Sequence, residues 1–452
     1  MRILALVDGE HHPPVVRAAL AALPSRHPGA EVVAAVVIGG TEKLRGDGLP
    51  DYGPGIAFAG IIGDPATALA GLVAQYRPDL IVDLSDQPVL DARSRMRLAA
   101  YALAAGVPYT GADFRFDPPP RPRVATKPSV AVIATGKRAG KTAVTGELAR
   151  LLRDRGTPPV VVTMGRGGPM APEVIDPATV DLTPAGLVAL AATGRHAASD
   201  HFEDAVTAGV VTIGTRRCGG GMAGAPVDST FTAGVELANT RPESIVLMEG
   251  SGASVPPAHA DATICLVPDT DDPELVTGYL GAYRVLLSDL IVITMVGASS
   301  AVSGVRAPRA GLLLEEGVRG VAPGVKVAHV VLRPFPLEPI SGRRVLYVTT
   351  APVSARADLV EHLEGEHGGR VVGVSHHLSD RQRLAADLEA AGEAEILLVE
   401  LKAAAVDLAA SVAVARGMRV VFCDNRVHSV SGDGPFSELA LFTADLAVQR
   451  HT

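Results

Sequence analysis

The sequence contains only three cysteines, Cys218, Cys265 and Cys423, and they lie far apart in the chain. An odd number at these spacings fits neither a disulfide framework nor a zinc site, and it suits a reducing compartment. No apolar run approaches the length of a transmembrane helix, and the first one, residues 3–7, is too short for a signal peptide. We therefore expect a cytoplasmic protein without a membrane partner.

Excess positive charge is also absent, because the formal net charge is −8 at pH 7. This balance argues against non-specific binding to nucleic acid, so an anionic ligand would have to be met by local basic clusters. Lysine is scarce among the 41 basic residues: the chain has only Lys43, Lys127, Lys137, Lys141, Lys326 and Lys402. Where arginine replaces lysine freely, the remaining lysines are enriched at positions that need a compact ammonium group.

The 452 residues are too many for one core, and strand and helix patterns alternate in three successive units. We expect an α/β fold of three-layer units, with domains at residues 1–117, 124–335 and 341–452. Proline-rich stretches, residues 117–123 and 333–339, precede the second and third units. Apolar runs without alternation indicate strands buried on both faces, hence mainly parallel sheets. Strands are expected at residues 3–7, 32–38, 80–84, 160–163, 210–214, 245–248, 262–267, 290–295, 327–332, 345–349, 371–374, 396–399 and 420–423.

The most informative stretch follows an apolar run at residues 130–134 and ends in Gly-Lys-Thr before a helix pattern. Backbone N–H groups of such a loop can turn toward phosphates, Lys141 can reach their oxygens, and Thr142 can hold Mg²⁺. The usual pattern has glycine six positions before the lysine, where this chain has Thr135. The alternative is a chance Gly-Lys-Thr in a helix-starting turn. The predicted nucleotide-binding residues are Gly136, Lys137, Arg138, Ala139, Gly140, Lys141 and Thr142.

An acidic residue, Glu249, ends the apolar run at residues 245–248 and is followed by Gly-Ser-Gly. Phosphoryl transfer needs a carboxylate at such a position, either to hold Mg²⁺ or to orient the attacking group. The competing interpretation is an ordinary strand end with a glycine turn.

Two glycine-rich basic loops could bind a phosphorylated ligand. Arg166 lies in the loop at residues 163–169, and Arg216 and Arg217 lie in the loop at residues 215–221. Adjacent arginine forks suit a multiply charged phosphate, although an exposed basic loop is the alternative. Lys402 follows the run at residues 396–401, where open α/β sheets place ligand-binding residues, or it is a solvated strand end.

Two further polar segments contain candidate ligands. The segment at residues 196–204 has no zinc spacing and is interpreted mainly as a helix capped by Ser199 or Asp200 with a solvated first turn, while Asp200 and His201 remain possible ligands. The loop that contains Asp8, Glu10 and His11 follows the first strand and could bind metal or substrate, or be an ordinary polar loop.

Guanine recognition in phosphate-loop GTPases uses an Asn/Thr-Lys-x-Asp element after a late strand. Residues 290–297 contain no such element. The sequence therefore favours ATP as the nucleotide.

Several of these stretches together resemble the cyclic 2,3-diphosphoglycerate synthetase family. The resemblance rests on Asp8-Gly9-Glu10-His11, residues 135–142, residues 216–221, Glu249-Gly250-Ser251-Gly252 and residues 400–405, and it covers essentially the whole chain. It implies an ATP-dependent enzyme that closes an intramolecular phosphoanhydride in 2,3-diphosphoglycerate and releases ADP and phosphate. The central unit also resembles dethiobiotin synthetase, which has a similar Glu-Gly-small-Gly turn.

These observations lead to one hypothesis about the site. Lys141, Lys137 and Glu249 are catalytic, and Mg²⁺ is held by Thr142 and Glu249. The small phosphorylated substrate is held by Arg138, Arg166, Arg216, Arg217 and Lys402. A homodimer is the default assembly. Two other functions stay open, a kinase that acts on a phosphoglycerate and a nucleotide-driven switch protein.

Overall fold

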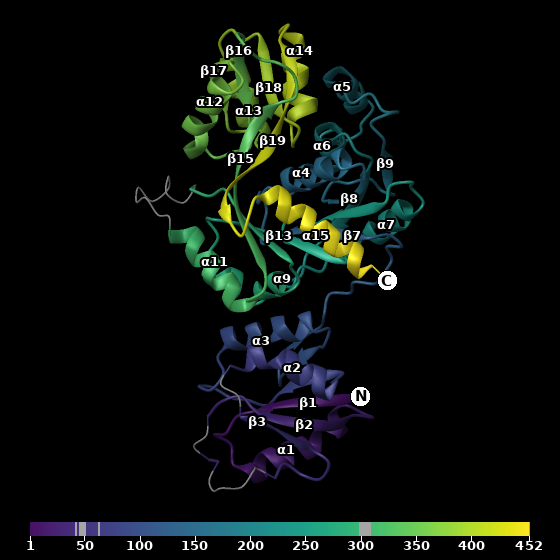
Figure 1. The fold of residues 1–452 in the computed structure, drawn as a ribbon, viewed down its shortest axis with the longest axis vertical. Helices are drawn as coiled ribbons and strands as arrows, with labels where there is room; N and C mark the ends of the chain where they lie inside the picture. The colour runs from purple at the N-terminus through teal and green to yellow at the C-terminus, as the bar shows by residue number, and fades with distance from the viewer. Residues whose placement is uncertain (41–42, 45–50, 62–63, 298–308, 452) are drawn as a thin grey trace. The chain divides into compact units, whose positions relative to one another are not determined.

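The computed structural model of the chain describes residues 1–40, 43–44, 51–61, 64–297 and 309–451. The chain forms two compact units, coloured by residue number in Figure 1. Unit 1 contains Met1–Pro119, Asp272–Leu287 and Gly317–Pro323, and unit 2 contains the described parts of Pro120–Asp271, Ser288–Glu316 and Gly324–Thr452.

Unit 1 is built on a sheet in the order β3-β2-β1-β4-β5-β6, which is parallel except for the β5–β6 pair. The central strand β1 is an apolar run buried on both faces, as a parallel sheet covered by helices requires. Strand order reverses between β1 and β4, so the loops after these two strands meet at one edge. The strands are β1 Arg2–Val7, β2 Glu31–Val37, β3 Ala57–Ile61, β4 Leu80–Asp83, β5 Tyr109–Thr110 and β6 Arg115–Phe116.

The helices of unit 1 begin where the sequence supplies capping groups. Asp64 accepts a hydrogen bond from the Ala66 N–H at the start of α2, and Asp91 accepts one from Ser94 N–H at the start of α3. The helices are α1 Pro13–Arg26, α2 Pro65–Tyr76, α3 Ala92–Ala104, α8 Pro273–Thr277 and α9 Ala282–Leu286, and α11 Arg309–Val321 has residues in both units.

Unit 2 contains one long sheet, in the order β11-β10-β8-β12-β7-β13-β14-β15-β19-β18-β16-β17 with β9 paired to β10. Neighbours are parallel from β10 to β15 and again from β19 to β17. The strands are β7 Ser129–Ala134, β8 Pro159–Gly165, β9 Glu173–Ile175, β10 Thr212–Cys218, β11 Asp228–Ser229, β12 Ile245–Glu249, β13 Ala262–Pro268, β14 Leu290–Thr294, β15 Lys326–Pro336, β16 Arg344–Val348, β17 Arg370–Ser375, β18 Ile396–Glu400 and β19 Arg419–Gly432.

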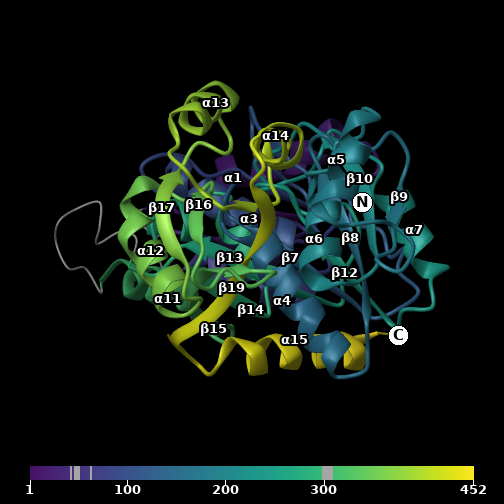
Figure 2. The same cartoon turned by 90° about the horizontal axis from the view of Figure 1, so that it is seen from above.

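A long antiparallel pair, β15 and β19, joins the two parallel parts of this sheet. The proline-rich segment after residue 332 does not leave the sheet there, since Pro334 pairs with Asn425 and Pro336 with Cys423. Figure 2 shows the two strands running together between the parts of unit 2. The second and third units expected from the sequence therefore share one continuous sheet.

Helices cover both parts of this sheet. The core around β7 contains Val144 and Leu148 of α4 together with Phe436 and Ala447 of α15, which lies across β7 and β13 in Figure 1. A second core gathers β16, β18 and β19 with residues of α5, α6 and α13. The helices are α4 Lys141–Asp154, α5 Pro184–Ala192, α6 Asp200–Ala208, α7 Phe231–Asn239, α12 Arg356–Gly365, α13 Arg381–Ala390, α14 Ser411–Ala415 and α15 Phe436–Arg450, with a 3₁₀ turn at Val353–Ala355 and a π-helix at Ala405–Ala410.

The predicted α/β class with largely parallel sheets is confirmed, and each strand expected from the sequence overlaps a strand of the structure. Among the described residues, no helix is both long and apolar enough to cross a membrane.

Candidate active site

The loop between β7 and α4 wraps around the Lys141 ammonium group. Lys141 is the first residue of α4 and is buried, and its Nζ donates hydrogen bonds to Gly136 O at 3.2 Å and Gly252 O at 2.9 Å. Gly140, directly before the helix, has φ +91, and a Cβ there would lie 2.7 Å from Leu332 Cδ1. Glycine is therefore required at this turn by both backbone conformation and space.

Thr135 explains why this loop departs from the usual glycine pattern. Its N–H donates to Leu266 O at 3.1 Å, and its hydroxyl donates to the Asp271 carboxylate. Thr135 is not among the residues with positive φ, so its position does not need glycine. The loop keeps its shape through a hydrogen-bonded side chain at this position.

Strand β12 brings Glu249 into contact with the start of α4. Strands β12 and β7 are parallel neighbours, so the carboxyl end of β12 lies beside the phosphate loop. Thr142 Oγ1 donates to Glu249 Oε1 at 3.0 Å, and both side chains are buried. The two residues predicted to share a metal ion are thus in direct contact.

The first turn of α6 adds acidic groups to this region. The helix begins at Asp200 with Ser199 at its N-cap position, as the sequence predicted, but the expectation of a solvated first turn was wrong. His201, Glu203 and Asp204 are buried, so the first turn of α6 is not solvated, and the Ser199 side chain makes no capping hydrogen bond. His201 instead lies between Ser199 Oγ, 3.0 Å from its Nδ1, and Glu173 Oε2, 3.3 Å from its Nε2. Glu203 and Asp204 were not among the predicted site residues. The only signal for them was the density of acidic residues in this segment.

The buried carboxyl groups are unusually poor in hydrogen-bond donors. Within the described residues, both oxygens of Asp204, Glu203 Oε2 and Glu249 Oε2 accept no hydrogen bond from an N–H or hydroxyl group. The Asp204 and Glu249 carboxyl groups can bond to each other only when one of them is protonated. An unpaired buried carboxylate is costly, so this arrangement favours either a bound cation or a bound proton.

The same burial shifts the pKa values of these groups. Burial raises the pKa of Glu249 to about 7, with a further increase from Asp200, and raises that of Glu203 to about 8. Burial also raises the pKa of Asp204 well above its usual value, and Glu249 adds to the shift. The Lys141 pKa falls to about 8 because burial disfavours the ammonium, although Glu249 opposes this change. Clusters of shifted groups of this kind are typical of functional sites.

The donor set fits Mg²⁺ bound together with a nucleotide. Among the described residues, no group of three or more His, Cys, Asp or Glu side chains is arranged to hold a metal ion by itself. Mg²⁺ in phosphate-loop enzymes needs only one or two protein oxygens, because phosphates and water complete its coordination. Thr142 Oγ1 and the free Glu249 oxygen are oxygens of this kind.

Two of the predicted arginines converge on the turn after β12. Arg217 Nη2 donates to Ser251 O at 2.8 Å. A Cβ on Gly252 would lie 2.5 Å from Arg166 Nη2. Burial and the nearby Arg166 charge lower the pKa of Arg217. Two guanidinium groups thus lie beside the carbonyl that binds Lys141, without a carboxylate of their own in the described residues.

The remaining basic residues of the loops point elsewhere. Arg216 contacts the sulfur of Met170. It points away from Arg217 because adjacent residues of β10 face opposite sides of the strand. Arg138, with φ +62, donates from Nη2 to Ser379 Oγ at 3.0 Å. Lys137 is exposed. Arg216 and Arg138 thus bind partners outside the turn at residues 251–252.

Lys402 reaches α6 rather than the loops. Its Nζ lies 3.3 Å from Glu203 Oε1, and it is close enough to Glu400 for the two charges to interact. Burial alone would lower the pKa of Lys402, but Glu203 and Glu400 raise it above its usual value. Lys402 therefore stays protonated beside the acidic groups of α6. Ala403, the next residue, has φ +47, a conformation that is strained for alanine.

The polar loop after β1 belongs to unit 1. Asp8 is buried, and its Oδ1 accepts hydrogen bonds from Glu10 N and His11 N at 3.1 Å each. His11 Nδ1 also lies 2.6 Å from Asp8 Oδ1, and Asp8 Oδ2 accepts from Asp86 N at 2.8 Å. Every oxygen of Asp8 is thus occupied by the protein itself, which supports the interpretation of Asp8 as a residue that shapes the loop.

The geometry of the loop, the helix and the strand end is that of a known class of nucleotide-binding protein. A strand, a glycine-basic loop and a helix that begins with Lys-Thr, with an acidic residue at the end of the neighbouring strand, form the nucleotide site of a P-loop protein. Three family models match the chain, the N-terminal domain of cyclic 2,3-diphosphoglycerate synthetase at residues 2–117, its P-loop domain at 129–330 and its C-terminal domain at 336–426. The chain belongs to the cyclic 2,3-diphosphoglycerate synthetase family.

Relatives of the same name resemble the chain over nearly its whole length. The cyclic 2,3-diphosphoglycerate synthetase of Rubrobacter xylanophilus is 45% identical over 97% of this chain and 97% of its own. That of Methanothermobacter thermautotrophicus is 41% identical over 97% of this chain and 94% of its own. Among solved structures, LpxK of Aquifex aeolicus aligns with a TM-score of 0.39 and 14% identity over 72% of this chain and 89% of that chain, a likeness too weak to bear on function.

Proposed function

We propose that this protein is an ATP-dependent ligase that converts 2,3-diphosphoglycerate to cyclic 2,3-diphosphoglycerate, with release of ADP and phosphate. The observation that carries the proposal is the phosphate loop with its buried Lys141 beside an acidic strand end, in a chain that belongs to this family. The names of the relatives at 45% and 41% identity support the choice of substrate.

In this proposal the loop at residues 136–142 binds the phosphates of ATP. Its backbone N–H groups and the N-terminus of α4 face the β- and γ-phosphates, and Lys141 neutralises charge as the γ-phosphoryl group is transferred. The Lys141 ammonium is held by two carbonyl oxygens, so it is positioned but not neutralised by an ion pair at short range. Lys137, exposed on the same loop, would approach the nucleotide from the solvent side.

The proposed Mg²⁺ ligands are the Thr142 hydroxyl and the Glu249 carboxylate. Their contact at 3.0 Å and the free second oxygen of Glu249 support this assignment. When bound, Mg²⁺ would supply a positive charge that neutralises the phosphate oxygens. The chain's own contribution is to hold these two oxygens at the end of the phosphate loop.

The substrate carries two phosphates and a carboxylate, so its site needs several cations. Arg166 and Arg217 are the strongest candidates, because both approach residues 251–252 beside the Lys141 ammonium. Arg138, Arg216 and Lys402 would be recruited from the surrounding loops. Of these three, Lys402 is the one that already faces the acidic side of the site.

The proposed reaction has two displacement steps. An oxygen of one substrate phosphate attacks the γ-phosphorus of ATP, and ADP leaves. An oxygen of the second substrate phosphate then attacks the phosphorus of the first, and inorganic phosphate leaves with the γ-phosphorus and the bridging oxygen. The product equals the substrate less one water, and one phosphoanhydride of ATP is consumed for the one formed.

The test is a single incubation of the protein with ATP, Mg²⁺ and 2,3-diphosphoglycerate, followed by phosphorus NMR and mass spectrometry. A cyclase gives a phosphoanhydride product that is lighter than the substrate by one water. A kinase that acts on a phosphoglycerate would instead give a product that is heavier by one phosphoryl group. A nucleotide switch would release phosphate without changing the added substrate. Either of these results would overturn the proposal.

Isotope labelling tests the route. If the substrate phosphates carry ¹⁸O, the released phosphate should contain one ¹⁸O atom, because the attacking substrate oxygen becomes the bridging oxygen that leaves. Hydrolysis that only drives a conformational change would give phosphate without substrate oxygen, and the two-step route would then be rejected.

The remaining assignments are proposals of the same kind. We assign three domains, at residues 1–117, 124–335 and 341–452, and a homodimer as the working assembly. A cytoplasmic location is supported by the three free cysteines, two of which are buried and none of which is paired.

A further inference from the structure

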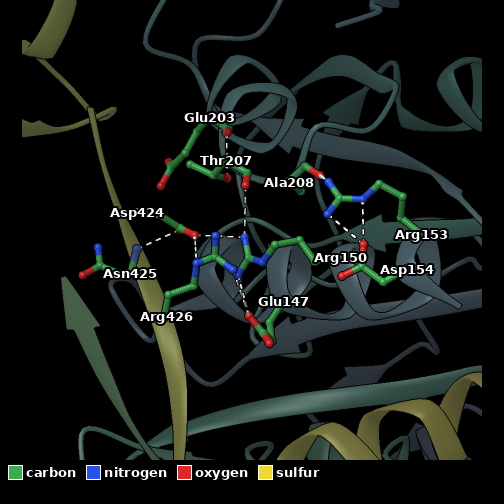
Figure 3. Close-up of polar contacts among 10 residues, drawn as sticks. All are labelled: Glu147, Arg150, Arg153, Asp154, Glu203, Thr207, Ala208, Asp424, Asn425 and Arg426. Carbon is green, nitrogen blue, oxygen red and sulfur yellow. Dashed lines mark hydrogen bonds and ion pairs between the residues drawn. The ribbon is translucent and has the colours of Figure 1, made fainter. Parts of the chain in front are cut away.

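Arg150 lies nine residues after Lys141 on α4 and has only 5% of its surface exposed. Its Nη2 donates to Glu147 Oε2 at 2.6 Å, and its Nη1 donates to Asp424 Oδ2 at 2.9 Å and to Thr207 O at 3.2 Å. Figure 3 shows this guanidinium group reaching from α4 to both β19 and α6. One side chain thus connects the phosphate-loop helix to two other elements of unit 2.

The connection continues along β19 into β18. Asn425, the residue after Asp424, donates from Nδ2 to Glu400 Oε1 at 3.1 Å. Glu400 ends β18 and also accepts hydrogen bonds from Thr349 Oγ1 at 2.7 Å and Thr350 N at 2.9 Å. The position of the β18 end, and of Lys402 two residues later, is therefore fixed against β19.

Lys402 connects the end of β18 to α6. Its Nζ lies 3.3 Å from Glu203 Oε1, and Thr207 Oγ1 donates to Glu203 O at 2.9 Å. Thr207 is the residue whose carbonyl accepts from Arg150. A closed chain of polar contacts thus runs from α4 through β19 and β18 to α6 and back to α4.

Burying this network costs desolvation energy that apolar side chains would not require. The core beside α4 is otherwise built from Val, Ile, Leu, Ala and Phe, so apolar packing was available to this region. Asp424 is shared with a second arginine, Arg426, whose Nε lies 2.8 Å from Asp424 Oδ2. What the network adds over apolar packing is a fixed direction and distance between elements that carry the site.

We propose that Arg150 is a positioning residue for the phosphoryl-transfer site. It sets Lys402 and the acidic turn of α6 at a fixed place relative to the phosphate loop, acting through Asp424 and the Thr207 carbonyl. It does not touch the nucleotide or the substrate. The proposal rests on the activity proposed above and deepens it by naming the group that aligns the two parts of the site.

The same helix supplies a matched control, Arg153. Its Nη1 donates to the Ala208 carbonyl, so it also contacts the end of α6. Its other partner is the exposed Asp154, and within the described residues it makes no hydrogen bond or ion pair with β19 (Figure 3). Arg153 therefore shares the helix, the charge and the contact with α6, but not the connection to Lys402.

The experiment compares full-length Arg150→Met, Arg153→Met and Lys402→Met, the doubles Arg150→Met/Lys402→Met and Arg153→Met/Lys402→Met, and Arg150→Lys. Melting temperature, kcat and KM for ATP are measured for each. We expect Arg150→Met to lower kcat about tenfold with KM for ATP within about twofold, because the phosphate loop is unchanged while the alignment is lost. Arg153→Met should stay within about twofold in both constants.

The double variants give the decisive readout. If Arg150 acts through Lys402, the loss of kcat from Lys402→Met should be smaller in the Arg150→Met background than in the wild type, and unchanged in the Arg153→Met background. Arg150→Lys should recover only part of the rate, since it keeps the charge but cannot bond three partners with a planar fork. Equal losses from Arg150→Met and Arg153→Met, or multiplicative losses with Lys402→Met, would overturn the proposal.

A second variant separates loss of folding in Arg150→Met from loss of alignment between Lys402 and the phosphate loop. If Arg150→Met did not fold, Asp424→Asn would replace it, because it keeps the shape of the partner and leaves Arg150 bound to Glu147 and Thr207. The same pattern of kcat and coupling is expected, and its absence counts against the proposal. If the wild type formed no cyclic product, the proposed function would fail, whereas ATP turnover in the same variants would still decide the role of Arg150.

Discussion

Two strands of the same sheet end in a buried glutamate, and the two carboxyl groups differ in their hydrogen bonds and in the direction of their pKa shifts. Strand β12 has the sequence Ile-Val-Leu-Met-Glu and ends at Glu249, and strand β18 has Ile-Leu-Leu-Val-Glu and ends at Glu400. Both glutamates are buried, and both have a lysine within electrostatic range, Lys141 for the first and Lys402 for the second.

Hydrogen bonding separates the two. Glu400 accepts from Thr349, twice from Thr350 and from Asn425, and these bonds together with Lys402 outweigh burial and lower its pKa. In the part of the chain that the structure describes, the Glu249 carboxyl group has a single donor, Thr142, and burial raises its pKa to about 7. A buried carboxylate whose lone pairs are all used is a structural group, whereas one with a free oxygen is prepared for a partner that the chain does not supply.

The largest expected effect on activity is at Lys141, the lysine beside Glu249. Lys141→Ala should reduce ATP turnover by about a thousandfold, because the ammonium stabilises charge that develops in the transition state. The fold should survive, since the Lys141 side chain bonds to two loop carbonyls and to no other described residue. Steady-state phosphate release and circular dichroism measure the two properties. Unchanged turnover in a folded variant would remove the nucleotide site from this loop.

The second largest effect is expected for substitution of Glu249, and it allows a direct comparison with Glu400. Glu249→Gln should lower kcat about a hundredfold, because the neutral amide cannot replace the charged carboxylate that we propose as a metal ligand. Its melting temperature should stay the same or rise, since an amide can accept from Thr142 and donate to Asp204. Thermal unfolding beside ATP-dependent product formation tests both statements. A marked loss of stability would show that Glu249 is a structural group like Glu400.

Glu400→Gln should give the opposite pattern. The amide nitrogen would face the hydroxyl and N–H donors of Thr349 and Thr350, so the free energy of unfolding should fall by about 1–3 kcal/mol. The loss of kcat should be smaller than for Glu249→Gln. Denaturant unfolding with both variants in one series checks the order, and a stable but inactive Glu400→Gln protein would contradict it.

The smallest expected effect concerns pH. Burial raises the pKa of Glu203 to about 8, so the folded state binds a proton that the unfolded state, with its ordinary carboxyl pKa, has lost. This contribution to stability is complete below the unfolded pKa and disappears as pH rises through about 8. Melting temperature should therefore fall between pH 5 and 8 more steeply in the wild type than in Glu203→Gln. Parallel slopes would contradict the assignment.

Part of the site could be predicted from the sequence, because its signals are local. The phosphate loop and Glu249 lie at strand ends that short apolar runs reveal, and β12 then places Glu249 against Thr142. The same reasoning gave the α/β class. Local patterns of this kind depend on neighbours in the chain and not on distant contacts.

The missed features all depend on distant contacts. Polar residues such as Glu203 and Asp204 are typical of a solvated turn, and only the packing of α6 buries them. The antiparallel pairing of β15 with β19 joins segments about ninety residues apart, and nothing in either segment identifies the other. Arg216 and Arg217 are equivalent as sequence, but alternation along β10 separates their side chains.

The return of α15 onto the β7 sheet has a consequence for synthesis of the protein. Phe436, Ala440 and Ala447 of α15 pack in one core with Val130 and Val132 of β7, so this core is complete only after the residues of α15 have left the ribosome. Domains usually fold in order as the nascent chain emerges, at about 5–20 residues per second. The core around the phosphate loop is therefore completed by a helix that follows it late in the chain, and a translation product without α15 would expose the apolar surface that α15 covers.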